Sequence, residues 1–392
     1  MHTPSHRYTT LILTVLVLGA APVAAVAQDD VQVHLFASQG FAKSTATNDF
    51  VITGTGEGTF DFNEFGFNLQ KQVTPKLRFG IQVFAQGRGD FGKDQPTIDW
   101  AFADYRFRDY VGIRVGKVKM PLGLYNETRD TDSLRTFLLL PQGVYSDRQR
   151  ESTIAQTGAA LYGTLPMKSL GSLAYQAHVG ALAITSNGGV AQDFEAKVPV
   201  LVTDASPERT YVGSLDWNTP VEGLRLAVTR FKTTFDFATT TTPAASSLGL
   251  PPGLTLPLNN EVQRTYCGVE YTFHDLVIAS EYMREDVRAL LATLPILQND
   301  DTYYVSGSYR LSKIVEVGAY YNASYEDRFH RDAGPSNFLK DGAATLRLDL
   351  NRYWTLKAEV HQIHGYWHIM QATTAPVAPD TTLFAIKTTV SF

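Results

Sequence analysis

The sequence of 392 residues holds one cysteine, Cys267, and carries a net charge of only −5 at pH 7. A single cysteine excludes a disulfide framework within the chain, and we expect Cys267 to be an inert residue on the apolar face of a strand. The mild charge argues against nucleic acid as a partner. Beyond residue 25, no apolar run approaches the ~20 residues of a membrane-spanning helix. These absences disfavour disulfide-rich, nucleic-acid-binding and helical membrane proteins.

Catalytic and metal-binding patterns are also missing. No G-x-S-x-G element is present, and the glycine cluster at residues 54–58 lies in a predicted loop, without the strand and helix that a phosphate-binding loop needs. His361, His364 and His368 are the candidate metal ligands, but His361 and His364 point to opposite faces of a strand. We therefore interpret them as interface histidines. The sequence predicts no enzyme, no cofactor and no bound metal.

The N-terminus has the pattern of a secretory signal peptide. A weakly basic start is followed by an apolar run over residues 11–25 and by the small residues Ala25 and Ala27. We predict cleavage after Ala27, so that residues 1–27 are the signal peptide and residues 28–392 form one domain. The residue directly after the predicted cleavage point is Gln28 and not a cysteine, which argues against a lipoprotein.

The last strand is the clearest β-pattern in the chain. In residues 381–392, Phe384, Ile386 and Val390 share one face, while Lys387 and Thr389 share the other. An apolar outer face with a polar inner face is typical of a membrane barrel. Taken alone, this strand is equally compatible with the edge of a soluble β-sandwich.

The whole chain decides between these two folds, because about sixteen strand patterns alternate between short turns and long loops. A soluble sandwich gives no reason for that alternation, and no fixed-period repeat indicates a propeller or β-helix. The sequence therefore predicts an all-β, transmembrane antiparallel β-barrel. The predicted strands cover residues 31–41, 59–73, 76–88, 97–108, 111–120, 152–165, 173–184, 208–217, 224–237, 261–273, 276–287, 300–311, 314–326, 340–350, 354–365 and 381–392. A register slip near Gly116 suggests a β-bulge.

Residues 121–151, which follow the fifth predicted strand, do not alternate and are dense in charge. Sixteen strands enclose a lumen too wide for side chains to fill. We therefore expect this third long loop to fold into the lumen and narrow it, with a short helical turn at residues 134–140; a solvated external loop is the alternative. Its candidate pore residues are Glu127, Arg129, Asp130, Asp132 and Arg135.

Arginines on the polar faces of neighbouring strands predict a basic patch on the lumen wall. Arg78, Arg106 and Arg114 are the expected pore residues, because arginine facing lipid at mid-membrane costs ~2–4 kcal/mol. Arg88 and Arg108 lie near strand ends, where headgroups or solvent are equally suitable surroundings. The patch and the acidic side chains of residues 121–151 are expected to produce a field across the constriction.

The run of residues 116–124, Gly-Lys-Val-Lys-Met-Pro-Leu-Gly-Leu, resembles a G-K-x-K-x-P-x-G-L stretch of the phosphate-selective porins. Sixteen strands with a constriction loop after the fifth are similar to bacterial porins in general, and a terminal phenylalanine resembles outer-membrane proteins. The resemblance implies a homotrimer with periplasmic termini, and it places Lys117 and Lys119 at the constriction. The chain departs from the group in its many carboxylates in the same loop.

These observations predict an outer-membrane porin that lets small hydrophilic solutes and ions diffuse passively, with outer-membrane lipid as its surroundings. One alternative is a substrate-specific anion channel for phosphate or organic acids. Another is a barrel with a structural or adhesive role. A barrel enzyme is the least favoured interpretation.

Overall fold

The computed structural model describes residues 31–46, 49–89, 92–331, 333–367 and 377–392. The predicted signal peptide and His368 lie outside these ranges. Within them, no helix is long and apolar enough to cross a membrane.

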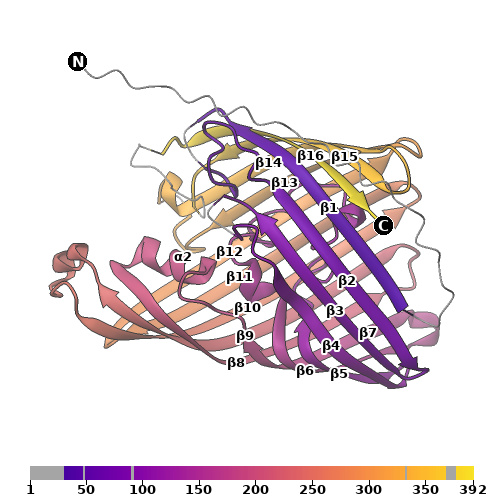
Figure 1. The fold of residues 1–392 in the computed structure, drawn as a ribbon, viewed down its shortest axis with the longest axis horizontal. Coiled ribbons are helices and arrows are strands. Elements are labelled where there is room, and N and C mark those ends of the chain that lie inside the picture. Colours follow the sequence, from indigo (N-terminus) through magenta and orange to yellow (C-terminus); the bar gives the residue numbers. More distant parts are fainter. Residues whose placement is uncertain (1–30, 47–48, 90–91, 332, 368–376) are drawn as a thin grey trace.

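Sixteen strands form one closed antiparallel barrel, in which each strand pairs with its sequence neighbours and β1 pairs with β16 (Figure 1). The predicted fold class and strand number are thus confirmed. The strands are β1 (Val31–Ser44), β2 (Asn63–Thr74), β3 (Leu77–Gly87), β4 (Thr97–Arg108), β5 (Val111–Lys119), β6 (Ala155–Pro166), β7 (Ser172–Leu182), β8 (Val200–Asn218), β9 (Leu224–Thr241), β10 (Thr255–Phe273), β11 (Leu276–Leu291), β12 (Leu294–Arg310), β13 (Val315–Tyr325), β14 (Phe338–Asp349), β15 (Trp354–His364) and β16 (Asp380–Ser391). The helices are α1 (Arg150–Thr153) and α2 (Gly189–Lys197), with 3-10 turns η1 (Asp132–Leu134), η2 (Lys168–Leu170), η3 (Pro243–Leu248) and η4 (Pro335–Asn337).

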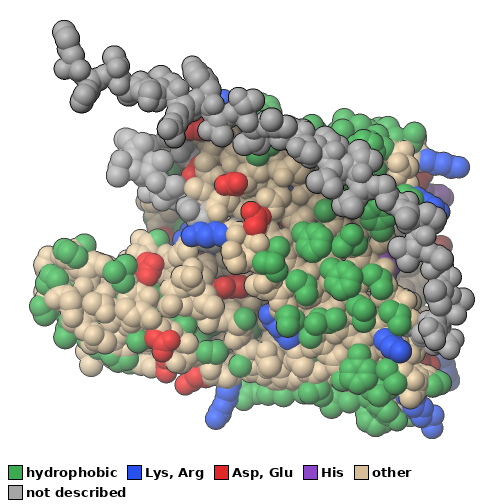
Figure 2. All heavy atoms as spheres, in the orientation of Figure 1, with side chains coloured by type: hydrophobic (Ala, Val, Ile, Leu, Met, Phe, Trp, Pro, Cys, Tyr) green, Lys and Arg blue, Asp and Glu red, His purple; other side chains and the backbone are tan. Residues whose placement is uncertain are grey.

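Over most of the barrel wall, apolar side chains point outward and charged side chains point inward. On β16, Phe384 and Ile386 are 54% and 45% exposed, while Lys387 and Thr389 are 1% and 3% exposed. Figure 2 shows hydrophobic side chains over much of the wall that faces the viewer. Cys267 is exposed on the outward face of β10, as predicted. This inversion of a soluble barrel is what a lipid environment requires, because lipid solvates apolar side chains and not charges.

The two ends of the barrel differ. At one end, short turns join β2 to β3, β4 to β5 and β10 to β11. Both described termini lie at this same end, where the Phe392 amide donates to the Leu35 carbonyl at 2.8 Å. We call it the short-turn end, and the opposite end the loop end. The long connections between β1 and β2, and between β13 and β14, are at the loop end.

Five consecutive strands are longer than predicted. Strands β8 to β12 have 16 to 19 residues, whereas the other strands have 9 to 14. Their outer ends project at the left of Figure 1. Much of residues 200–207, 238–241, 255–260, 288–291 and 294–299, predicted as loop, is therefore strand. In these added residues the inward face is apolar, with Val200, Leu258 and Leu291 buried, so the alternation of outward apolar and inward polar residues on which the prediction relied is absent.

Two local predictions are wrong. The helical turn expected at residues 134–140 is replaced by η1, which ends at Leu134, because Leu138 and Leu139 instead donate their amides to Glu359 on β15. The expected bulge at Gly116 is absent: its φ is 128°, yet pairing with β4 and β6 continues through it. The apparent slip arises because Val118 and Met120 are buried rather than lipid-facing, at 1% and 0% exposure.

Candidate functional site

The segment of residues 121–151, between β5 and β6, contacts strands that lie far from it around the barrel. Glu281 of β11 accepts hydrogen bonds from the Leu124 amide at 2.8 Å and from the Tyr145 hydroxyl. Tyr304 of β12 donates to the same carboxylate at 2.7 Å. Glu281 is 1% exposed, so one buried wall carboxylate fixes two points of the segment.

A second set of contacts joins the middle of the segment to β15 and β16. Glu359 accepts the amides of Leu138 at 2.8 Å and Leu139 at 2.9 Å. The carboxylate of Asp132 lies 2.9 Å from Lys387 Nζ and 3.2 Å from Lys357 Nζ. Burial alone raises the pKa of Asp132, but the two lysines and Arg135 outweigh it and hold the pKa well below its usual value.

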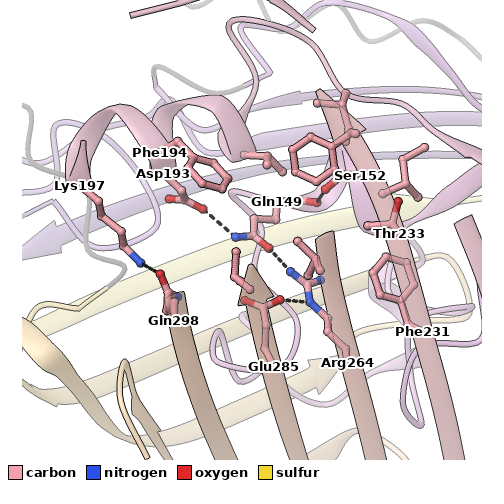
Figure 3. Close-up of a pocket in the computed structure, with 16 residues that line it drawn as sticks. Gln149, Ser152, Asp193, Phe194, Lys197, Phe231, Thr233, Arg264, Glu285 and Gln298 are labelled. Carbon is pink, nitrogen blue, oxygen red and sulfur yellow. Dashed lines mark hydrogen bonds and ion pairs between the residues drawn. The ribbon is translucent and has the colours of Figure 1, made fainter. Parts of the chain in front are cut away.

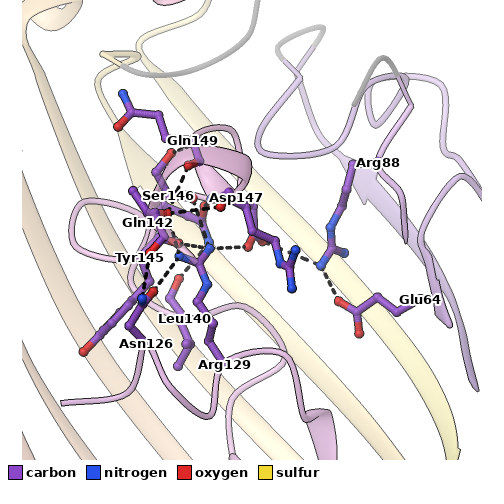
Figure 4. A network of polar contacts seen from close by, with 12 residues as sticks. Glu64, Arg88, Asn126, Arg129, Leu140, Gln142, Tyr145, Ser146, Asp147 and Gln149 are labelled. Atoms are coloured by element: carbon purple, nitrogen blue, oxygen red, sulfur yellow. Dashed lines mark hydrogen bonds and ion pairs between the residues drawn. The ribbon is translucent and has the colours of Figure 1, made fainter. Parts of the chain in front are cut away.

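A third set of contacts connects the segment with β2 and with the residue after β3 (Figure 4). Arg88 lies 2.6 Å from Glu64 and 3.6 Å from Asp147, which also binds Arg129 at 3.0 Å. Burial raises the pKa of Asp147, but the guanidinium groups of Arg88, Arg129 and Arg135 outweigh it and lower the pKa to about 2. Arg88 is 2% exposed and belongs to this network, not to headgroups or solvent.

The predicted loop residues are thus mostly bound in ion pairs. Asp130 lies 2.7 Å from Lys119 Nζ and also accepts a hydrogen bond from Gln82. Arg135 lies 3.4 Å from Asp132 and 3.9 Å from Glu64. The resemblance placed Lys119 beside this segment, and its ammonium also donates to the Glu127 carbonyl at 2.7 Å.

The predicted wall arginines surround one acidic residue. Arg78 and Arg114 lie 2.8 Å and 3.3 Å from Asp104, which also accepts the Tyr162 hydroxyl. Arg106 is exposed, two residues further along β4. The structure therefore brings the patch together, but Asp104, which sequence reasoning did not select, neutralises one of its three charges.

Acidic side chains line a cavity next to residues 121–127. Glu127 accepts a hydrogen bond from Gln176 at 3.0 Å, and among the described residues no lysine or arginine forms an ion pair with it. It shares a cavity of about 170 Å³ with Asp216 and Arg225. Arg225 binds Asp216 and lies 3.8 Å from Glu270, so one guanidinium serves two carboxylates.

Two larger cavities lie toward opposite ends of the barrel. One of about 600 Å³ is lined by Leu134 and Arg135 and by residues at the short-turn end such as His274 and Arg310. The other, of about 510 Å³, lies toward the loop end and includes Lys117, whose ammonium donates to the Ile98 carbonyl at 2.6 Å. The 121–151 segment contributes side chains to both.

His361 and His364 point to opposite faces of β15, as the strand pattern requires, but His361 does not have the expected role. His364 is 49% exposed beside Asp380, whereas His361 is fully buried between Asp341 and Glu359. His361 is therefore part of the interior polar network, not an interface residue. In the described part of the chain, no group of three or more His, Cys, Asp or Glu is arranged to hold a metal ion.

Comparison with known proteins identifies the fold. No protein-family model and no curated protein matches the sequence. Among solved structures, OmpT of Vibrio cholerae, folded in vitro, has a TM-score of 0.59 and 12% identity over 94% of this chain and 100% of that one. The anion-selective porin from Comamonas acidovorans has a TM-score of 0.57 and 10% identity over 93% of this chain and 100% of that one. The outer-membrane channel DcaP of Acinetobacter baumannii has a TM-score of 0.59 and 10% identity over 93% of this chain and 97% of that one.

The chain has a porin fold. The porin fold accounts for the inverted polarity of the barrel wall and for the difference between its two ends. The trimer form of Vibrio cholerae OmpT also matches, with a TM-score of 0.53 and 9% identity over 93% of this chain.

Proposed function

We propose that the protein is an outer-membrane porin through which small hydrophilic solutes and ions diffuse passively. The observation that carries this proposal is a closed sixteen-stranded barrel whose outward face is apolar and whose inward face holds the charged side chains. A barrel of this width encloses more space than its own side chains fill. Such a wall separates lipid from water and provides a polar path across the membrane.

The 121–151 segment acts as the constriction of this channel. Its anchors on β11, on β15 and β16, and on β2 support a position across the lumen. The pore-lining set that we propose is the one predicted from sequence: Arg78, Arg106, Arg114, Lys117, Lys119, Glu127, Arg129, Asp130, Asp132 and Arg135. Because most of its charges are paired, selectivity comes chiefly from the groups left in excess. These are the arginines around Asp104 on one side and Glu127, Asp216 and Glu270 on the other.

Location and assembly follow from the same proposal. Residues 1–27 are removed on export, the barrel inserts into the outer membrane, and the short-turn end with both termini faces the periplasm. Three copies form a homotrimer. The support for the trimer is the resemblance to porins and the trimeric form of one structural neighbour.

A substrate-specific anion channel is the second candidate, and one observation favours it. Arg78, Arg106 and Arg114 supply three positive charges around the single carboxylate of Asp104, and the lysines of the 116–124 run lie close by in the sequence. Such an excess attracts phosphate or organic acids. Saturable block of the current by one of these anions separates this candidate from general diffusion.

Single-channel currents in a planar bilayer under a salt gradient test the proposal. Purified protein should give a steady open pore. The Arg78→Ala/Arg106→Ala/Arg114→Ala variant should move the reversal potential toward cation preference, because it removes three lumen cations and keeps Asp104. A silent bilayer with well-folded protein would contradict the channel function. An open pore with unchanged selectivity would contradict only the role of the arginines.

A further inference from the structure

The outer face of β9 to β12 changes from apolar to charged toward the loop end. In Figure 3, Phe231, Arg264 and Glu285 lie around a cavity beside α2, on the lumen side of these strands. Because side chains alternate along a strand, Arg230 and Arg284, their neighbours in sequence, point out of the barrel. Arg230 is exposed, and the Arg284 side chain is 48% exposed. Arginine thus occupies the face that is apolar over most of the wall.

The strand register places these arginines next to the last apolar row of the outer face. That row consists of the cross-strand partners Val228, Cys267, Tyr282 and Tyr303. The next row toward the loop end consists of Arg230, Thr265, Arg284 and Asp301. From this row to its end at Phe273, β10 has about the 9–11 residues that a strand needs to cross the hydrocarbon. The polar row therefore lies at the depth of lipid headgroups, with tyrosines at the boundary.

A belt of charged residues begins with this polar row. By outer belt we mean the charged residues of the polar row and of the next two rows on β9 to β12, together with those of residues 327–331, which lie against them. Its cations are Arg230, Lys232, Arg284, Arg288, Arg328 and Arg331, and its carboxylates are Glu261, Asp286, Asp301 and Asp327. Asp286 is shared by Arg284 and Arg328, at 3.2 Å and 2.7 Å. With His330 neutral, the outer belt keeps an excess of positive charge.

Arg230 has hydrogen-bond donors to offer to a ligand. Among the described residues no carboxylate forms an ion pair with it, and it donates instead to two neutral acceptors, the Thr265 hydroxyl and the Gln263 amide oxygen. Arg284 lies in the same row two strands away, roughly 10 Å along the row, with Thr265 between them. Because both arginine side chains are long and exposed, their guanidinium groups reach toward each other over Thr265. A phosphate group fits between them, since each guanidinium presents paired donors to phosphate.

We propose that the outer belt binds a membrane lipid with a phosphate monoester headgroup, its phosphate between Arg230 and Arg284 and its acyl chains over the adjoining apolar row. The excess of cations at headgroup depth is complementary to an anionic lipid. The apolar row gives the chains of the same molecule a surface to contact, which a free phosphate ion cannot use. This inference goes beyond diffusion through the channel, and it rests on the proposed function only for placing the lipid in the outer leaflet.

The thiol of Cys267 provides a local probe, because it lies in the row directly next to Thr265 on the same face of β10. The folded protein is labelled there with bimane and placed in phosphatidylcholine nanodiscs. Brominated phosphatidic acid or brominated phosphatidylcholine is then added at equal mole fraction. Bromine quenches the probe on contact, so quenching measures which lipid occupies this position. We expect phosphatidic acid to be preferred at least fivefold, about the effect of one basic residue at an anionic surface.

Two double variants separate the outer belt from net charge. Arg230→Gln/Arg284→Gln should abolish the preference, and it leaves Asp286 bound to Arg328. Lys313→Gln/Arg352→Gln, which removes two exposed positive charges at the short-turn end, is the matched control and should keep the preference. Inorganic phosphate should lower the preference no more than chloride does at the same ionic strength.

Three results would overturn the proposal: equal quenching by the two lipids in the wild type, wild-type preference in Arg230→Gln/Arg284→Gln, or loss of the preference with inorganic phosphate but not with chloride. A probe that neither lipid reaches would show that another copy of the chain covers the outer belt, and would also overturn it. Bilayer currents of the same proteins test the channel separately. Open pores without lipid preference would remove the lipid site and leave the porin, whereas lipid preference without current would keep the site and remove the channel.

Discussion

The carboxylate of Asp132, in the segment between β5 and β6, lies 2.9 Å from the ammonium of Lys387 on the last strand. Both side chains are 1% exposed or less, and Lys357 completes the cluster at 3.2 Å from the same carboxylate. Asp132 thus contacts two buried lysines, from β15 and β16, and Glu64 supplies a second carboxylate at 3.0 Å from Lys387. This contact links the segment to the strands that close the barrel.

Asp132→Asn should destabilise the protein strongly, because it leaves Lys357 buried without a carboxylate partner and leaves Lys387 with Glu64 alone. Removing one partner of a buried ion pair typically costs about 3–5 kcal/mol. We expect a lower free energy of unfolding in detergent and a noisier single-channel current. Asp61→Asn, at an exposed position, is the matched control and should leave both unchanged. Wild-type stability of Asp132→Asn would show that this cluster does not hold the segment.

The ion pairs of the segment should resist moderate acid. The pKa of Asp147 is lowered to about 2, and that of Asp132 lies well below its usual value. Both ionised carboxylates therefore stabilise the folded state, and their full contribution is present above about pH 4, the pKa of an aspartate in the unfolded chain. The contribution is lost only as the pH falls through the folded values. Hydrogen exchange of residues 121–151, corrected for its intrinsic pH dependence, should be equally slow at pH 7 and pH 5 and fast near pH 2. Rapid exchange already at pH 5 would contradict this.

Glu281→Gln should loosen the other side of the segment. The carboxylate accepts hydrogen bonds from the Leu124 amide and from two tyrosine hydroxyls. In glutamine one of the two oxygens is replaced by an NH₂ group, which donates and cannot accept these hydrogen bonds. A buried donor left without an acceptor costs about 1–3 kcal/mol. Thermal unfolding, followed by the gel shift of the folded barrel, should move to lower temperature. Tyr304→Phe, which removes one donor and leaves the charge, should have a smaller effect.

The sequence predicted the barrel well, because alternation is a property of each strand by itself. On β16 the faces of Phe384 and Lys387 follow directly from the period of two. The outer ends of β8 to β12 were missed because there the inward face is apolar, as at Leu258 and Leu291. α2 was missed because its apolar residues cover that inward face and not a soluble core.

The charged composition of the candidate site predicted which segment forms it, but not which residues pair with each other. The charge of residues 121–151 marked the segment, but nothing local to Asp147 identifies Arg88, or to Asp132 identifies Lys387. These pairs form between elements far apart in the chain, and an alternating pattern specifies the face of a strand but not what lies opposite that face. The neutralising role of Asp104 was missed for the same reason, since Arg78 and Arg114 come from two different neighbouring strands.

The most direct test of the central claim is whether residue 134 lies in the conduction path. Leu134 is 67% exposed and lines the cavity of about 600 Å³ at the short-turn end. In a Cys267→Ser background, Leu134→Cys provides a single thiol for a charged methanethiosulfonate reagent during single-channel recording. A segment that constricts the lumen predicts a stepwise fall in conductance on labelling, larger for a bulkier reagent, and no step in the Cys267→Ser parent. Complete labelling without any change in current would contradict the claim that residues 121–151 form the constriction.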